Sequence, residues 1–130
     1  MRRILVVEDD EAMSQHIGDI LTRAGFKVSA AFDGVAGLEA IRSCPPDLVV
    51  LDIFMPEKDG LEMLVELRRL EIMTPVLIIS GKQHLLSGAS MALAEQLGAS
   101  GALAKPFTPK ELLNQVTRIA GMLETSEPAR

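Results

Sequence analysis

The sequence predicts an α/β fold, in which a parallel β-sheet is covered by helices on both faces. Short apolar runs typical of strands begin near residues 3, 27, 47, 75 and 101, and segments with helical spacing of apolar residues lie between them. This regular alternation implies parallel strands joined by right-handed crossovers. The length of 130 residues suits one domain with a full-sized core.

Four of the apolar runs end in polar residues that can carry chemistry. Glu8 and Asp9 follow the first run, Asp52 the third, Ser80 the fourth and Lys105 the fifth. In open parallel sheets, ligands bind at the carboxyl ends of the strands. We therefore expect these five side chains to meet at one edge of the sheet and to form a site.

The first two helices have clear boundaries in the sequence. Apolar residues recur at helical spacing over 11–24, and Gly25 supplies a stop. The next helix is predicted to start after Asp33, an N-cap residue, and to end before Pro45.

The third helix is predicted to follow Asp59, with Glu62 three residues on as in a capping box. The fourth is the weakest pattern, over roughly 90–97, with Gly98 as its stop. The segment before it, 82–90, is predicted to be a long loop.

The last helix has the strongest start signal. Thr108 is a predicted N-cap, Pro109 stands at the first helical position and Glu111 completes a capping box. The predicted domain covers residues 1–123, and 124–130 form a polar tail or the start of a linker.

Composition excludes several classes of protein. The net charge is −5 and no basic patch is evident, which argues against nucleic-acid binding. No apolar stretch is long enough to span a membrane, and the first one is too short for a signal peptide. Cys44 is the only cysteine, so a cytoplasmic location fits, and we expect it to be a partly buried small hydrophobe.

The acidic residues predict a metal-dependent phosphoryl site. Glu8, Asp9 and Asp52 would repel one another at close range, and a hard divalent cation such as Mg²⁺ would offset this charge. Lys105 adds a cation for a phosphoryl oxygen, and Ser80 adds a hydroxyl donor. A carboxylate nucleophile with these neighbours suits aspartyl-phosphate chemistry.

These residues also carry a family resemblance. The chain resembles a response-regulator receiver domain of bacterial two-component signalling, of the chemotaxis-receiver type, from residue 2 to about 123. The segments that match are 5–11, 51–56, 59–61, 79–81 and 101–107. The resemblance implies a flavodoxin-like, doubly wound five-stranded parallel sheet of order 2-1-3-4-5 with five helices.

The resemblance implies a role for each site residue. Asp52 would accept a phosphoryl group from a phosphohistidine, and Ser80 would donate a hydrogen bond to that group. Lys105 would pair with Asp52 or with the phosphoryl group, and the peptide bond after Lys105 would be cis. Asp9, Asp52 and the backbone carbonyl of Phe54 would bind Mg²⁺ directly, and Glu8 through a water. Such a domain is a signalling phosphoacceptor that assists its own phosphorylation and slow dephosphorylation, rather than an enzyme.

The implied partners are proteins. A sensor histidine kinase or phosphotransfer protein would supply the phosphoryl group, and a downstream protein or output domain would bind the switched surface. That surface, and a homodimer contact, would involve the helix at 90–97, the strand at 102–105 and the last helix. The chain departs from many receivers at Ala102, where a Tyr or Phe is common.

Several alternatives stay open. A haloacid-dehalogenase-type phosphatase would need an acid where Phe54 stands, and a flavodoxin-like electron carrier would need a phosphate loop where Glu8 and Asp9 stand. Within the family, the chain is either a docking receiver that works without phosphorylation or the N-terminal part of a longer DNA-binding or output regulator. His16, on a predicted solvated helix face, and His84, in a predicted loop, are assigned no catalytic role.

Overall fold

One five-stranded parallel sheet organises the molecule, and its strand order is β2-β1-β3-β4-β5. The computed structural model describes residues 2–53, 60–81 and 88–125. The strands are β1 (Arg3–Val7), β2 (Lys27–Ala31), β3 (Leu48–Asp52), β4 (Val76–Gly81) and β5 (Gly101–Lys105). The described residues hold five helices: α1 (Glu11–Arg23), α2 (Gly34–Ser43), α3 (Gly60–Arg69), α5 (Gly88–Gln96) and α6 (Pro109–Thr125). The predicted fold class, strand order and set of helices are confirmed.

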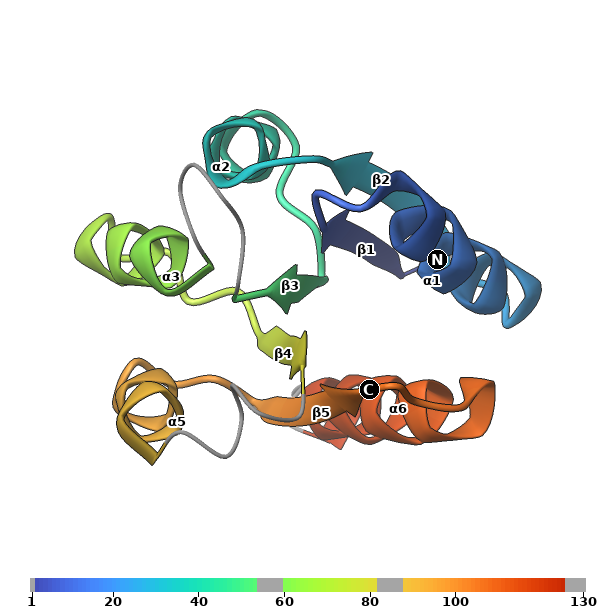
Figure 1. The fold of residues 1–130 in the computed structure, drawn as a ribbon. Coiled ribbons are helices and arrows are strands. Elements are labelled where there is room, and N and C mark those ends of the chain that lie inside the picture. The colour runs from blue at the N-terminus through green and yellow to red at the C-terminus, as the bar shows by residue number, and fades with distance from the viewer. Residues whose placement is uncertain (1, 54–59, 82–87, 126–130) are drawn as a thin grey trace.

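The helices form a layer on each face of the sheet (Figure 1). Helices α2, α3 and α5 cover one face, and α1 and α6 cover the other. Side chains alternate along each strand, so Leu5 and Val7 pack beneath the first layer, whereas Ile4 and Val6 pack beneath the second. Strands β1 and β3 are therefore buried almost throughout, as expected for parallel strands covered on both faces.

The helix starts follow from short polar side chains. The Asp33 carboxylate accepts the Ala36 N–H at 2.7 Å at the start of α2, which confirms the predicted N-cap. At the start of α6, the Glu111 N–H donates to Thr108 Oγ1 at 3.1 Å, and the Thr108 N–H donates to Glu111 Oε1 at 2.9 Å. These reciprocal bonds are the predicted capping box. The glycine predicted to stop α1, Gly25, has a φ of +99°.

Some predicted boundaries differ from the structure. Helix α5 begins at Gly88, inside the segment predicted to be a loop, and α6 continues to Thr125, two residues beyond the predicted end of the domain. Helix α3 begins at Gly60, as the pattern indicated, but the predicted N-cap Asp59 lies outside the described residues.

The prediction of a partly buried Cys44 was wrong, because its side chain is exposed. Helix α2 ends at Ser43, and Cys44 follows as the C-cap, beyond the part of the helix that packs on the sheet. Its sulfur accepts a hydrogen bond from the Arg3 guanidinium.

Arg68 joins three segments beside the sheet. Its guanidinium donates to the carbonyl oxygens of Leu97 at 2.7 Å, Ile72 at 2.7 Å and Thr74 at 3.2 Å. The side chain of α3 thereby holds both the residues that follow α5 and the loop that leads into β4. In the part of the chain that the structure describes, no helix is both long and apolar enough to cross a membrane.

Candidate functional site

The carboxyl ends of β1, β3, β4 and β5 bring the predicted site residues together. The parallel register pairs Val7 with Leu51, so Glu8 and Asp52 leave neighbouring strands at the same level. The register of β4 and β5 pairs Ser80 with Ala104, next to Lys105. All five predicted side chains therefore lie at one edge of the sheet.

Three carboxylates form the centre of the site. Glu8, Asp9 and Asp52 each offer an oxygen, and these oxygens all lie within 4.8 Å of one another. Glu8 is 1% exposed and Asp52 4% exposed, whereas Asp9 faces solvent. Two buried acids beside a third create a concentration of negative charge that needs a cation.

Lys105 supplies one positive charge and bridges the two buried acids. Its Nζ lies 3.0 Å from Glu8 Oε1 and 3.0 Å from Asp52 Oδ2. The contact with Asp52 is the one that the resemblance implied. The contact with Glu8 was not predicted, since Glu8 was expected to act through a metal-bound water. The peptide bond between Lys105 and Pro106 is cis, which also agrees with the resemblance.

The protonation of the site shows that the positive charge of Lys105 alone does not balance the three acids. Burial, together with the hydrogen bond to Asp52, raises the pKa of Glu8 to about 8, while Lys105 opposes the change. Burial by itself lowers the pKa of Lys105, but its bonds to Glu8 and Asp52 outweigh this and raise the pKa overall. Near neutral pH, Lys105 is therefore charged and Glu8 retains a proton.

The donor set fits a hard divalent cation. The oxygens of the three acids are the ligand type that Mg²⁺ prefers, and Asp9 leaves one side of the cluster open to solvent. Glu8 Oε2 is buried and has no hydrogen-bond partner among the described residues. A buried, unpaired carboxylate oxygen beside two other acids is unfavourable unless a positive group or water satisfies it.

Ser80 is buried at the same edge with its hydroxyl unused. The residue is 0% exposed, and its Oγ has no partner within the described ranges. An unpaired buried hydroxyl has a free-energy cost that an incoming acceptor oxygen would remove. This side chain can therefore donate a hydrogen bond to a group attached at Asp52.

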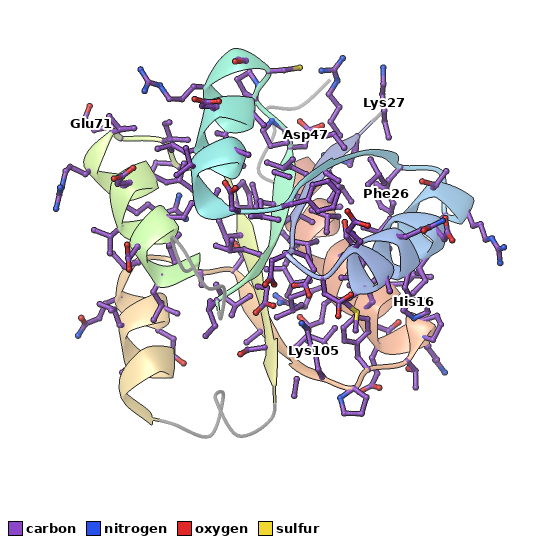
Figure 2. All side chains as sticks on the ribbon, turned by 45° about the horizontal axis from the view of Figure 1, so that its top comes forward. His16, Phe26, Lys27, Asp47, Glu71 and Lys105 are labelled. Carbon is purple, nitrogen blue, oxygen red and sulfur yellow. The ribbon has the colours of Figure 1, made fainter. Side chains whose placement is uncertain are left out.

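The other residues singled out in the sequence lie elsewhere or outside the described residues. Phe54, whose carbonyl was expected to bind the metal, and His84 lie outside the described residues. His16 is on an exposed face of α1, as predicted, and Figure 2 shows it on that helix. Ala102, which stands where many receivers have an aromatic residue, is partly buried and packs against the core beneath α5.

The chain matches a known family over most of its length. A model of the response regulator receiver domain matches residues 4–117. The alkaline phosphatase synthesis transcriptional regulatory protein PhoP of Bacillus subtilis is 34% identical over 128 residues, which cover 98% of this chain and 52% of that protein. Response regulator MprA of Mycobacterium avium is 36% identical over 126 residues, covering 97% and 53% respectively. The chain thus spans about half the length of the curated relatives it matches.

A solved structure matches over nearly the full length of both chains. The response regulator receiver domain protein (CheY-like) from Methanospirillum hungatei JF-1 superposes with a TM-score of 0.90 at 26% identity, covering 98% of this chain and 99% of its own. The same arrangement of strands and helices is therefore found in a solved protein of similar sequence and nearly the same length.

Proposed function

The chain belongs to the response regulator receiver family of two-component signalling, and on that premise we propose that it accepts a phosphoryl group on Asp52. The observation that carries the proposal is the bridge from Lys105 Nζ to Glu8 and Asp52, 3.0 Å from each. This bridge places a cation beside a buried carboxylate, at the sheet edge where Ser80 has an unused hydroxyl. A sensor histidine kinase or a phosphotransfer protein is the proposed donor.

In the proposed transfer, an oxygen of Asp52 forms a bond to phosphorus. The bond between phosphorus and the imidazole nitrogen of a phosphohistidine breaks, and its electron pair stays with that nitrogen. Lys105 already contacts Asp52 Oδ2, so it lies where negative charge on the phosphoryl oxygens needs compensation. Ser80 donates its hydroxyl hydrogen to an oxygen of the attached group. The domain is thus a phosphoacceptor that assists its own phosphorylation and slow dephosphorylation, rather than an enzyme with a separate substrate.

The proposed metal site uses the acids at the same edge. Asp9 and Asp52 would hold Mg²⁺ with the carbonyl of Phe54, and Glu8 would contribute through a water. When bound, Mg²⁺ would neutralise carboxylate charge and polarise the phosphoryl oxygens. The unpaired Oε2 of Glu8 supports a positive group or an ordered water at this position.

The proposed output is a change in partner binding. The surface formed by α5, β5 and α6 lies next to Ser80 and Lys105 in the sheet, and is proposed to bind a downstream protein, an output domain or a second copy of the chain. Ala102 cannot act as the rotating aromatic of many receivers, so the switch would depend on Ser80 and nearby backbone. The cytoplasmic location and a receiver boundary near residue 123 remain predictions from the sequence.

Intact mass after incubation with acetyl phosphate tests the proposal directly. We expect the mass of one phosphoryl group to be gained when Mg²⁺ is present and to be absent in Asp52→Asn. Asp47→Asn is the matched control, because Asp47 precedes the same strand at its other end and should leave phosphorylation intact. Full phosphorylation of Asp52→Asn, at any site, would refute the assignment of the acceptor.

Two specific observations keep related functions under test. Ala102 favours a docking receiver that works without phosphorylation. This hypothesis would be supported if incubation with acetyl phosphate and with phosphohistidine donors both left the mass of the protein unchanged. The half-length match to PhoP and MprA favours the receiver part of a longer regulator. The length of the intact gene product in its own cells would decide that question.

A further inference from the structure

A pocket lies at the end of the sheet opposite the acidic site. It has a volume of about 270 Å³ and lies between β1, β2 and the C-terminal half of α2. Figure 2 shows Lys27, which lines it, and the nearby Asp47 at the far side of the molecule from Lys105. The pocket is therefore separate from the proposed phosphoryl site.

Small side chains explain why the pocket exists. Ala40 and Ser43 face it from α2, and Ser29 faces it from β2, which is an edge strand. None of them is large enough to fill the space between the helix and the sheet. Leu5, a core residue of β1, lines the pocket as well, so a ligand that enters would meet an apolar surface.

Two positive charges stand side by side at this pocket. Arg3 and Lys27 are paired residues of the parallel strands β1 and β2, and both line the pocket. Like charges on paired strand positions repel each other. Within the described residues, the Arg3 guanidinium bonds only to Cys44 Sγ, and the Lys27 ammonium makes no hydrogen bond or ion pair.

Among the residues that the structure describes, the pocket lining contains no acid that would offset these charges. Asp47 contacts Arg3, but its Oδ2 accepts the backbone N–H of that residue at 2.8 Å and not an N–H of the guanidinium. Arg3 and Lys27 are both exposed, and within the described residues no acid is bonded to their charged groups. An anion between them would remove the repulsion and gain charge-assisted hydrogen bonds.

We propose that this pocket binds a small amphipathic anion, with its carboxylate or phosphate between Arg3 and Lys27 and its apolar body against Leu5 and Ala40. The planar fork of Arg3 suits either kind of oxyanion. The pocket volume limits the apolar part to a short chain or a single ring. Binding does not require phosphorylation of Asp52 or a metal ion.

Amide chemical shifts of the ¹⁵N-labelled protein provide the test. The probes are hexanoate and hexyl phosphate, and the controls are hexan-1-ol, which lacks the charge, and inorganic phosphate, which lacks the apolar body. We expect one or both probes to shift the amides of Ser29, Ala40 and Cys44 saturably, and the tighter probe identifies the preferred oxyanion. Bound probe should also slow alkylation of Cys44, the only thiol, by iodoacetamide.

Charge variants separate this site from non-specific binding. Arg3→Gln and Lys27→Gln should each weaken the probe about tenfold, because each removes one charged hydrogen-bond donor. Lys110→Gln, at an exposed position of α6, should leave affinity unchanged. Ala40→Leu should fill the pocket, and the two Gln variants keep the proposal testable if this variant does not fold.

Three results would overturn the proposal. The first is the absence of saturable shifts at the pocket with either probe. The second is equal affinity for hexan-1-ol or inorganic phosphate. The third is unchanged probe affinity in both Arg3→Gln and Lys27→Gln.

Discussion

Gly60, the first residue of α3, lies against the end of the strand that carries Asp52. A Cβ at this position would lie 2.6 Å from the Cα of Ile53 and 3.0 Å from the carbonyl carbon of Asp52, and it would overlap the carbonyl oxygen of Asp52. These are backbone atoms, so no side-chain rotation relieves the contact. The Gly60 N–H also donates to the Ile53 carbonyl at 3.1 Å, which fixes the approach. Gly60→Ala must therefore separate α3 from the end of β3 by roughly 1 Å to reach normal carbon contacts.

This displacement should reduce both stability and phosphorylation. Overpacking of this kind lowers the free energy of unfolding by about 2 kcal/mol. It also moves Asp52 away from its 3.0 Å contact with Lys105, so phosphorylation by acetyl phosphate should slow. Gly18→Ala is the matched control, because its Cβ would meet only Val28 Cγ1 at 3.8 Å. Inside helix α1, this control should stabilise the protein by about 0.5–1 kcal/mol.

Urea unfolding followed by circular dichroism measures both effects. The two alanine variants should move the midpoint in opposite directions with unchanged slopes. If Gly60→Ala matched Gly18→Ala in stability and in rate of phosphorylation, the close approach of α3 to Asp52 would be refuted. A stable Gly60→Ala with slow phosphorylation would instead confine the effect to the position of the carboxylate.

Three further predictions follow from buried polar contacts. Lys105→Met should lower the stability of the metal-free protein by about 3 kcal/mol in urea unfolding, because the buried side chains of Glu8 and Asp52 lose the cation that bridges them, whereas Lys110→Met should have no effect. In the folded protein Glu8 keeps its proton up to about pH 8, whereas in the unfolded chain it loses the proton near pH 4.5. Between these two pH values the unfolded state therefore binds fewer protons than the folded state. Metal-free stability should therefore fall as pH rises through this window, by up to ~1.4 kcal/mol per unit, and Glu8→Gln should flatten the profile. Arg68→Met should lower the unfolding free energy by about 2 kcal/mol, since four backbone carbonyls lose a donor, and exposed Arg69→Met should not; equal losses would contradict this role.

Local sequence patterns were sufficient to predict the features of the structure that depend on residues close together in the chain. Thr108 and Glu111 stand three residues apart, so their capping box is visible in the sequence and is present in the structure. The same holds for Asp33 at the start of α2 and for Gly25 after α1. The weak pattern near residue 90 gave an imprecise helix start, because small residues without polar caps mark no boundary, and α5 begins at Gly88.

Local sequence patterns did not predict contacts between segments that are distant in the chain. Arg68 lies on an ordinary helical segment, and nothing near it in the sequence indicates that its guanidinium binds the carbonyl of Leu97. Cys44 was expected to be partly buried from its residue type, yet its exposure depends on where α2 leaves the sheet. The pocket beside Arg3 and Lys27 exists only because small residues of α2 face an edge strand.

The sequence by itself determined the α/β class and the strand ends that carry Glu8, Asp9, Asp52, Ser80 and Lys105, because apolar runs and their polar endings are local properties of the chain. Only the tertiary structure decided how these groups pair. Strands β1 and β5 are separated in the sheet by β3 and β4, and the long side chain of Lys105 reaches across to Glu8 as well as to Asp52. Burial of both acids at that point, which depends on the packed layers around them, raises the pKa of Glu8 and leaves the edge short of positive charge.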